Sequence, residues 1–241
     1  MKLILAALAF TLTFAASAAV AEEAASPLSF NVSLTSDYRY RGLSQSRLDP
    51  ALQGGADYAF ANGFYLGTWA STIKWIKDAP FNGGANAEID VYGGYKTEIA
   101  SGLMLDFGAL TYIYPGNDLN PRADTTEIYG ALSFGPVTAK YSHSVTNLFG
   151  TADSKGSGYV DVSASFDIGG GFTVVPHVGY QRVKNTSAAS YTDYSLTLNK
   201  DYAGFTFGAA YVGTNTDVYV GGPSLKNLGK DGLVVSVKKV F

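Results

Sequence analysis

The links between the alternating segments of this chain themselves alternate in length. From residue 29 onward, apolar and polar residues alternate in segments of about ten to fourteen residues, each bounded by turn residues. Short glycine-containing links, such as 61–63 and 169–171, alternate along the chain with longer polar links, such as 76–85 and 215–230. With an even number of strands, the short links and both termini lie on one side and all long links lie opposite. Outer-membrane barrels have this asymmetry, with short periplasmic turns and long external loops.

We therefore predict an all-β fold, a transmembrane antiparallel up-and-down β-barrel of about 12 strands. Most segments reach the ~9–11 residues that a tilted membrane strand needs. Pattern alone also allows ten or fourteen strands, or a soluble periplasmic all-β domain. The predicted strands are 29–41, 50–60, 63–75, 86–100, 102–114, 124–135, 136–148, 157–168, 171–182, 191–201, 203–214 and 231–241.

The chain ends on an aromatic residue, Phe241, at the close of an alternating segment that begins at Leu233. A strand at the very end of a chain needs a partner for its edge, and the first strand after the leader is the obvious one. Pairing the two closes the sheet and leaves no free edge. The ending also resembles the C-terminal signal of outer-membrane barrels, which predicts Phe241 as an assembly signal read by the barrel assembly machinery.

Residues 1–21 have the pattern of a secretory signal peptide, with Lys2 before an apolar core and small residues at two cleavage sites, after Ala18 or after Ala21. This leaves 22–241 for the barrel and predicts export to the Gram-negative outer membrane. A formal net charge of −3 argues against a nucleic-acid partner. The absence of cysteine excludes disulfides and thiolate metal sites.

In such a barrel the polar side of each strand faces the lumen, and the apolar side faces outer-membrane lipid. The lumen then carries charges of both signs, with Arg39 and Arg41 as a candidate selectivity pair. Those charges either leave a water path or pair across the lumen and close it. Aromatic residues near strand ends, such as Trp69, Tyr112, Tyr114, Tyr202 and Tyr211, are expected at the membrane interfaces. The pore-lining candidates are Asp37, Arg39, Arg41, Asp57, Glu88, Asp90, Asp106, Glu127, Lys140 and Asp161.

Neither histidine predicts catalysis. The same-face neighbours of His143 are Tyr141 and Val145, and those of His177 are Val175 and Gly179, so neither strand supplies a serine beside the imidazole. Two histidines on separate strands, with no cysteine, also give no metal-ligand spacing. We expect no catalytic residue, no metal and no cofactor. A lipid-hydrolysing barrel remains the weakest of the alternatives.

The most distinctive sequence motifs are two runs of residues, Ser36-Asp37-Tyr38-Arg39-Tyr40-Arg41-Gly42 and Gly63-Phe64-Tyr65-Leu66-Gly67-Thr68-Trp69. These two runs resemble the TorF-like porins of proteobacteria in order and spacing. The resemblance implies an outer-membrane channel and carries over no catalytic residue. We expect a passive diffusion channel for small hydrophilic solutes. The alternative is a closed barrel whose loops bind an external partner. No residue pattern specifies an interface between copies of the chain.

Overall fold

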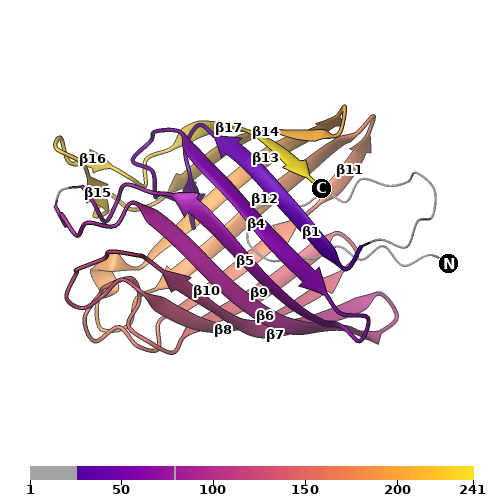
Figure 1. Cartoon of the computed structure of the whole chain (residues 1–241), viewed down its shortest axis with the longest axis horizontal. Helices are drawn as coiled ribbons and strands as arrows, with labels where there is room; N and C mark the ends of the chain where they lie inside the picture. Colours follow the sequence, from indigo (N-terminus) through magenta and orange to yellow (C-terminus); the bar gives the residue numbers. More distant parts are fainter. Residues whose placement is uncertain (1–25, 79) are drawn as a thin grey trace.

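The computed structural model describes residues 26–78 and 80–241, which form a closed antiparallel barrel of twelve strands (Figure 1). This confirms the predicted all-β architecture and strand number. The barrel strands are β1 (Leu28–Thr35), β4 (Ala51–Ala59), β5 (Phe64–Thr72), β6 (Ala87–Ala100), β7 (Leu103–Ile113), β8 (Thr125–Phe134), β9 (Val137–Ser144), β10 (Gly158–Ala164) with β11 (Phe166–Gly169), β12 (Phe172–Arg182), β13 (Tyr191–Tyr202), β14 (Phe205–Thr214) and β17 (Gly232–Val240).

The first and last strands close the barrel, as the chain ending predicted. Strand β1 pairs with β17 from Asn31↔Val240 to Thr35↔Ser236, and its other edge pairs with β4. The amide of Phe241 donates to the carbonyl of Phe30 at 2.8 Å, so hydrogen bonding continues to the last residue. Every strand thus has two neighbours, which removes the open edges that otherwise favour aggregation.

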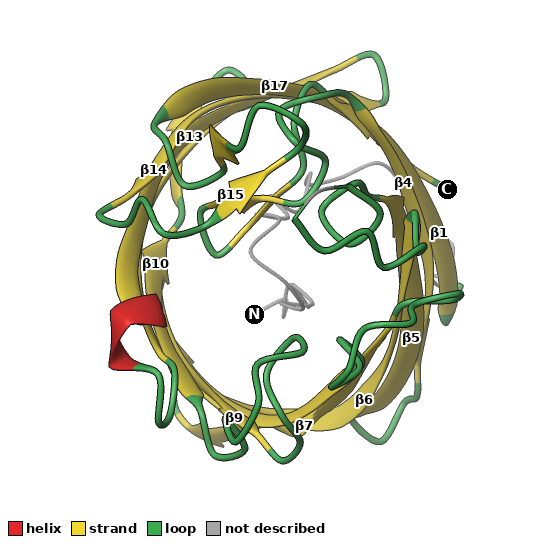
Figure 2. Cartoon of the chain, turned by 90° about the vertical axis from the view of Figure 1, so that its left-hand side faces the viewer, coloured by secondary structure: helices red, strands yellow, loops and turns green. Residues whose placement is uncertain are grey.

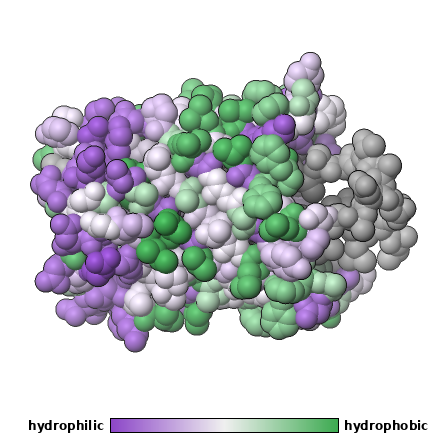
Figure 3. Space-filling view, in the orientation of Figure 1, coloured by the Kyte–Doolittle hydropathy of each residue, from purple (hydrophilic) through white to green (hydrophobic). Residues whose placement is uncertain are grey.

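Side chains alternate between the lumen and the outer surface along each strand. In β8, Glu127 and Tyr129 are buried inside the barrel, whereas Ile128 and Leu132 are exposed on its outer surface. Figure 3 shows apolar residues around the middle of the barrel and hydrophilic residues gathered at the loop end. The apolar face therefore points outward, which is the reverse of a soluble sandwich or barrel.

The two ends of the barrel differ in the length of their connections. The tight turns lie at the same end as the C-terminus, and all the long loops lie at the other, which we call the loop end (Figure 1). Viewed from the loop end, loop segments lie inside the ring of strands (Figure 2). Among the described residues, no helix is long and apolar enough to cross a membrane. The short elements at this end are β2 (Arg39–Tyr40), β3 (Leu43–Ser44), the 3₁₀ helix η1 (Ser187–Ala189), β15 (Val220–Gly221) and β16 (Lys226–Asn227).

The structure corrects three details of the sequence prediction. Strand β1 ends at Thr35 rather than at residue 41, and the strand predicted at 157–168 is interrupted at Ser165, which separates β10 from β11. Trp69, Tyr112 and Tyr114 are buried in an internal aromatic cluster and do not lie at the membrane interfaces. In contrast, Tyr202 and Tyr211 are exposed on the outer surface, as expected. The predicted signal peptide, 1–21, lies outside the described residues.

Candidate functional site

The segment between β1 and β4 folds into the barrel and carries three of the predicted pore residues. We call residues 36–50 the inward loop. It turns back on itself at Arg41 and Gly42, which have positive φ angles of 47° and 78° and join the short strands β2 and β3. Glycine suits the second position, since an ideal Cβ there would lie 2.5 Å from Thr214 Cγ2 and 2.7 Å from Asp193 Cβ. The inward loop therefore packs directly against the lumen side of β13 and β14.

Asp37 organises the base of the inward loop. Its carboxylate accepts hydrogen bonds from the Ser44 hydroxyl at 2.5 Å and the Ser46 hydroxyl at 3.1 Å, and it also pairs with Arg39 Nε. Arg39 Nη1 donates to the carbonyls of Leu228, at 3.2 Å, and Lys230, at 3.0 Å. Arg39 thus ties the inward loop to the loop between β14 and β17 and is not a lone cation on the lumen wall.

Arg41 reaches across the lumen to the opposite wall. Its two terminal nitrogens donate to both carboxylate oxygens of Glu127 on β8, at 3.1 and 2.7 Å, and Nη1 also donates to Gln181 Oε1 on β12 at 2.6 Å. The guanidinium lies over the rings of Tyr40 and Tyr159, 4.8 and 4.2 Å from their centres. Burial alone would lower the pKa of Arg41, but the Glu127 carboxylate outweighs it and raises this pKa well above its usual value. The buried charge is therefore compensated by a two-pronged ion pair.

Two tyrosines of the inward loop contact the acidic wall beside Arg41. The Tyr38 hydroxyl donates to Glu88 Oε1 on β6 at 2.6 Å, and the hydroxyls of Tyr40 and Tyr112 lie 2.6 Å apart. Burial raises the pKa of both inward-loop phenols well above the usual value, so they remain neutral donors. Asp90, also on β6, is fully buried, and neither of its carboxylate oxygens has a hydrogen-bond partner among the described residues.

A second polar cluster surrounds His177 on the lumen face of β12. The imidazole Nε2 lies 2.7 Å from Asp161 Oδ2, and Nδ1 lies 3.7 Å from Asp193 Oδ1. The Tyr159 hydroxyl donates to both oxygens of Asp193 at 3.1 Å, and the ring of Tyr159 stacks with Arg41. The polar network around Arg41 therefore continues along the wall from β8 to β13.

The other predicted pore residues lie on the lumen side, closer to the turns. Asp106 accepts a hydrogen bond from the Tyr65 hydroxyl at 2.6 Å, and the ammonium of Lys140 lies 4.1 Å from the centre of the Tyr129 ring. Asp57 accepts a hydrogen bond from Tyr92. Strand parity thus predicted the inward direction of these side chains, but their partners are mostly tyrosines and not opposite charges.

Sequence reasoning missed several residues that complete this network. Asp193 and Tyr159 lie on the inward face of their strands, so period-two parity could have identified both. The side chain of Gln181 also lies on the inward face of its strand, but it is uncharged and so does not stand out among the charged pore-lining candidates. Tyr38 and Tyr40 carried no such signal, because an extended strand through residue 41 would place both on the outer surface.

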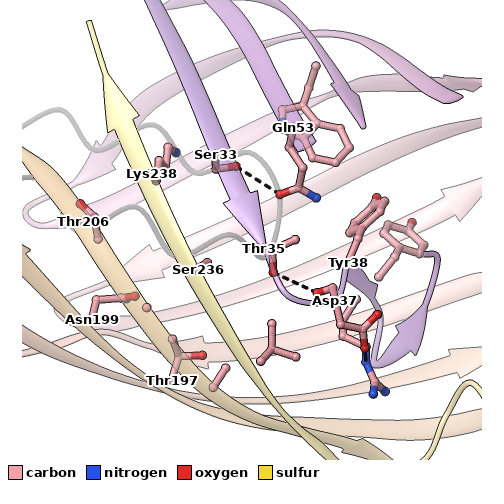
Figure 4. Close-up of a pocket in the computed structure, with 16 residues that line it drawn as sticks. Ser33, Thr35, Asp37, Tyr38, Gln53, Thr197, Asn199, Thr206, Ser236 and Lys238 are labelled. Atoms are coloured by element: carbon pink, nitrogen blue, oxygen red, sulfur yellow. Dashed lines mark hydrogen bonds and ion pairs between the residues drawn. The ribbon is translucent and has the colours of Figure 1, made fainter. Parts of the chain in front are cut away.

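Two cavities flank the inward loop, and Tyr40 lines both. The cavity on the turn side measures about 140 Å³, and Figure 4 shows the polar side chains around it. The cavity on the loop side measures about 310 Å³ and is lined mainly by apolar side chains, several of them aromatic. The inward loop therefore stands between a polar chamber and an aromatic vestibule. The turn-side lining includes Ser33, Thr35, Gln53, Asn199, Ser236 and Lys238, and the vestibule includes Trp75, Phe81, Phe149, Tyr191 and Tyr219.

Each histidine has a tyrosine hydroxyl within hydrogen-bond distance, and Ser163 and Ser195 lie opposite His177 on the two neighbouring strands. Tyr141 lies 3.2 Å from Nδ1 of His143, and Tyr159 lies 3.2 Å from Nε2 of His177. These contacts join an imidazole to a phenol and so differ from the serine–histidine pair of a hydrolase triad. Within 26–78 and 80–241, no group of three acidic, histidine or cysteine side chains is arranged to hold a metal ion.

The profile of a bacterial protein family of unknown function, Gcw_chp, matches residues 21–241. No curated protein matches the chain. Among solved structures, the KdgM porin in complex with disordered oligogalacturonate superposes with a TM-score of 0.56 at 9% identity, covering 89% of this chain and 98% of that porin. The NanC porin gives 0.55 at 13% identity, covering 87% and 98%. At these identities the likeness shows a shared porin-like barrel fold.

Proposed function

The chain belongs to the bacterial Gcw_chp family of unknown function, and we propose that this member is an outer-membrane porin for passive diffusion of small hydrophilic solutes. The solutes would move down their own gradients, without a cofactor and without chemical change. The proposal includes export by residues 1–21, insertion by the barrel assembly machinery and contact with outer-membrane lipid along the apolar face.

One observation carries this proposal, namely the opposite polarity of the two faces of a closed barrel. A closed barrel satisfies every strand hydrogen bond internally, as a membrane span requires. Its outer face exposes large apolar side chains, including Leu66, Leu196 and Phe207, to the surroundings. Its inner face presents hydroxyls, amides and charges around the 140 Å³ turn-side cavity. Such a wall favours water and hydrophilic solutes inside and lipid outside.

The inward loop would set the size and charge limit of the channel. Arg41, Glu127 and Tyr40 stand between the two cavities, so a solute must pass this polar contact. The aromatic vestibule lies above it and offers ring faces on which the apolar face of a sugar ring can stack. The KdgM porin has the same fold and was solved with an oligogalacturonate, so a barrel of this kind can accommodate an oligosaccharide.

A closed barrel with partner-binding loops is the second candidate, and the bridge from Arg41 to Glu127 and Gln181 favours it. Its three hydrogen bonds join the inward loop to β8 and β12 across the lumen. Buried ion pairs of this geometry resist opening, because breaking one leaves an uncompensated charge in a poorly solvated site. In this reading the long loops at the mouth would carry the function.

Single-channel conductance of the refolded mature chain in a planar bilayer distinguishes these two candidates. We compare the wild type with Arg41→Ala/Glu127→Ala, which removes both sides of the bridge. Arg122→Ala is the control, since Arg122 also forms an ion pair, 2.7 Å from Asp124, but its side chain is largely solvent-exposed. A porin gives discrete steps that enlarge only in the bridge variant. If all three proteins fold and insert but none gives conductance steps, the porin proposal is rejected and the closed barrel is supported.

Arg39→Ala/Arg41→Ala tests whether the arginine pair sets ion preference. Because Arg39 is bound to Asp37 and to backbone carbonyls, we expect this variant to change the noise of the open channel as well as its selectivity. An unchanged preference between cations and anions would contradict a selectivity role for this pair.

A further inference from the structure

A basic cluster lies on the outer surface of the barrel at its loop end, outside the lumen network. It consists of His143 at the end of β9, Lys155 in the loop before β10, and Arg182 and Lys184 at the end of β12. Together with neighbouring polar residues they surround an open concavity of about 840 Å³, in which Asp153 is the one acidic side chain. The cluster therefore carries a net positive charge.

The cations of this cluster have no acidic partner. Neither Lys155, Arg182 nor Lys184 forms an ion pair with any residue of the described chain, although the inward-loop arginines all do. Like charges held close together repel, and this repulsion costs folding free energy unless an anion compensates it. The arrangement thus points to a negatively charged ligand.

Backbone contacts hold the cluster in place. Gly156, with φ +89°, lies between two of its members, since an ideal Cβ there would be 3.4 Å from Lys184 Nζ and 3.9 Å from His143 Cε1. The amide of Lys184 donates to the Ser157 hydroxyl at 3.0 Å, and the Asn185 side chain donates to the carbonyl of Asp153 at 2.9 Å. The two loops that carry the cations are therefore fastened to each other.

The position of the cluster along the barrel identifies the kind of anion. On the same strands, the next outward-facing side chains toward the middle are Tyr141 and Tyr180, both 48% exposed. The hydroxyl of Tyr141 lies 3.2 Å from His143 Nδ1, so the aromatic belt and the basic cluster adjoin. Tyrosines of this kind mark the boundary between hydrocarbon and headgroups. The cations then lie at the depth of lipid headgroups on the loop side.

We propose that His143, Lys155, Arg182 and Lys184 bind the phosphate groups of a phosphorylated glycolipid in the outer leaflet. Arginine and lysine suit phosphate, because both donate charge-assisted hydrogen bonds to its oxygens. The acyl chains of that lipid would lie along the apolar wall formed by β9, β10 and β12. This inference rests on the membrane location in the proposed function, but not on conduction through the lumen.

Binding of bisphosphorylated lipid A to the refolded mature chain in neutral detergent micelles, followed by native mass spectrometry, tests the proposal. We expect a bound lipid that persists on activation, and loss of binding when both phosphates are removed from the lipid. Equal retention of the dephosphorylated lipid would overturn the proposal, because the acyl chains alone would then suffice. Competition by inorganic phosphate at concentrations equal to the lipid would also overturn it, in favour of a free-anion site.

The variant Lys155→Gln/Arg182→Gln/Lys184→Gln removes the three permanent charges. We expect its affinity for lipid A to fall on the order of 100-fold, given the usual contribution of each basic residue near an anionic membrane. Lys77→Gln/Lys226→Gln/Lys230→Gln removes as much charge from exposed positions at the same end and should bind like the wild type. Equal affinity in both triple variants would refute the site.

Conductance measurements on Lys155→Gln/Arg182→Gln/Lys184→Gln test whether the lipid site is independent of conduction through the lumen. A variant that conducts like the wild type but does not bind lipid A supports a wall site independent of the lumen. If the wild type binds lipid A but never conducts, the porin assignment fails and the lipid site stands.

Discussion

Arg41 on the inward loop and Glu127 on β8 form a two-pronged ion pair across the lumen, with nitrogen–oxygen distances of 3.1 and 2.7 Å. Both side chains are almost fully buried. We expect Arg41→Ala to lower the free energy of unfolding by ~3–5 kcal/mol, because it leaves the carboxylate buried without a partner. The double variant Arg41→Ala/Glu127→Ala should cost less than the sum of the single changes.

Denaturant unfolding of the barrel in lipid vesicles measures this coupling. Arg122→Ala serves as the control, since its exposed pair with Asp124 should contribute only ~0–1 kcal/mol. Additive single and double effects at Arg41 and Glu127 would show that the two residues do not stabilise each other.

Gly42 and Gly116 allow a matched test of how tightly the inward loop packs. Both have positive φ, 78° and 75°, but a Cβ at Gly42 would collide with Thr214 and Asp193, whereas none lies within 4 Å at Gly116. Gly116→Ala should cost only the ~1–2 kcal/mol of a left-handed backbone. Gly42→Ala should cost clearly more and expose the inward loop to proteases. Equal thermal stability and equal proteolysis of the two variants would mean that the inward loop does not pack against β13 and β14.

Asp49 makes the attachment of the inward loop sensitive to acid. Lys74 donates to its carboxylate at 2.7 Å and, with help from Arg47, holds the pKa of Asp49 below its usual value. Because that pKa is lower in the folded state, the pair stabilises the fold above the unfolded value of ~3.9, and this contribution is lost as the pH falls through the folded pKa.

The partial exposure of Asp49 limits this effect to less than ~1 kcal/mol. We expect Asp49→Asn to lower the unfolding free energy at neutral pH and to leave it nearly unchanged at pH values below the folded pKa of Asp49, where the wild-type carboxyl is protonated. A difference between variant and wild type that persists unchanged in acid would contradict the ion-pair explanation.

Phe241 gives a test that separates assembly from stability. Phe241 is 66% exposed, its backbone exchanges hydrogen bonds with Phe30, and the centre of its ring lies 5.1 Å from the ammonium of Lys239. Phe241→Ala should therefore refold in vitro with nearly unchanged stability, but reach the outer membrane of cells at a much lower level if the ring is an assembly signal. Val240→Ala, which changes an adjacent exposed side chain, is the control. Normal levels of the Phe241→Ala protein in the outer membrane would show that the Phe241 ring is not an assembly signal.

The strands of the barrel could be predicted because the side chains of each one alternate between an apolar outer face and a more polar lumen face. In β8, for example, Glu127, Tyr129 and Ala131 alternate with apolar outward residues, and that period is visible in sequence. The pairing of β1 with β17 could also be predicted, because the hydrogen-bonding edge of the last strand needs a partner strand. Parity also placed Glu88, Asp106 and Lys140 on the correct face.

The inward loop could not be predicted, because its sequence fits an extended strand equally well. Residues 37–41 alternate between charged and aromatic, and only tertiary contacts decide between a strand and a turn. The bridge from Arg41 to Glu127 joins residues 86 positions apart, and the left-handed backbone of Arg41 has no sequence signal. The burial of Tyr112 follows in part from the same contacts, since Tyr40 of the inward loop is one of its partners, whereas Tyr114 packs against Trp75 and Phe149 of other loops.

The pairing of β1 with β17 has a consequence for how the chain is made. Thr35 contacts the carbonyl of Val235, 200 positions later, so the cylinder cannot be completed while the ribosome is still adding the last strand. Contacts of such long range are slow to form, because a long loop must be ordered first. If the chain is exported as proposed, it therefore crosses the periplasm with the barrel still open, because β1 and β17 can pair only after both have been made.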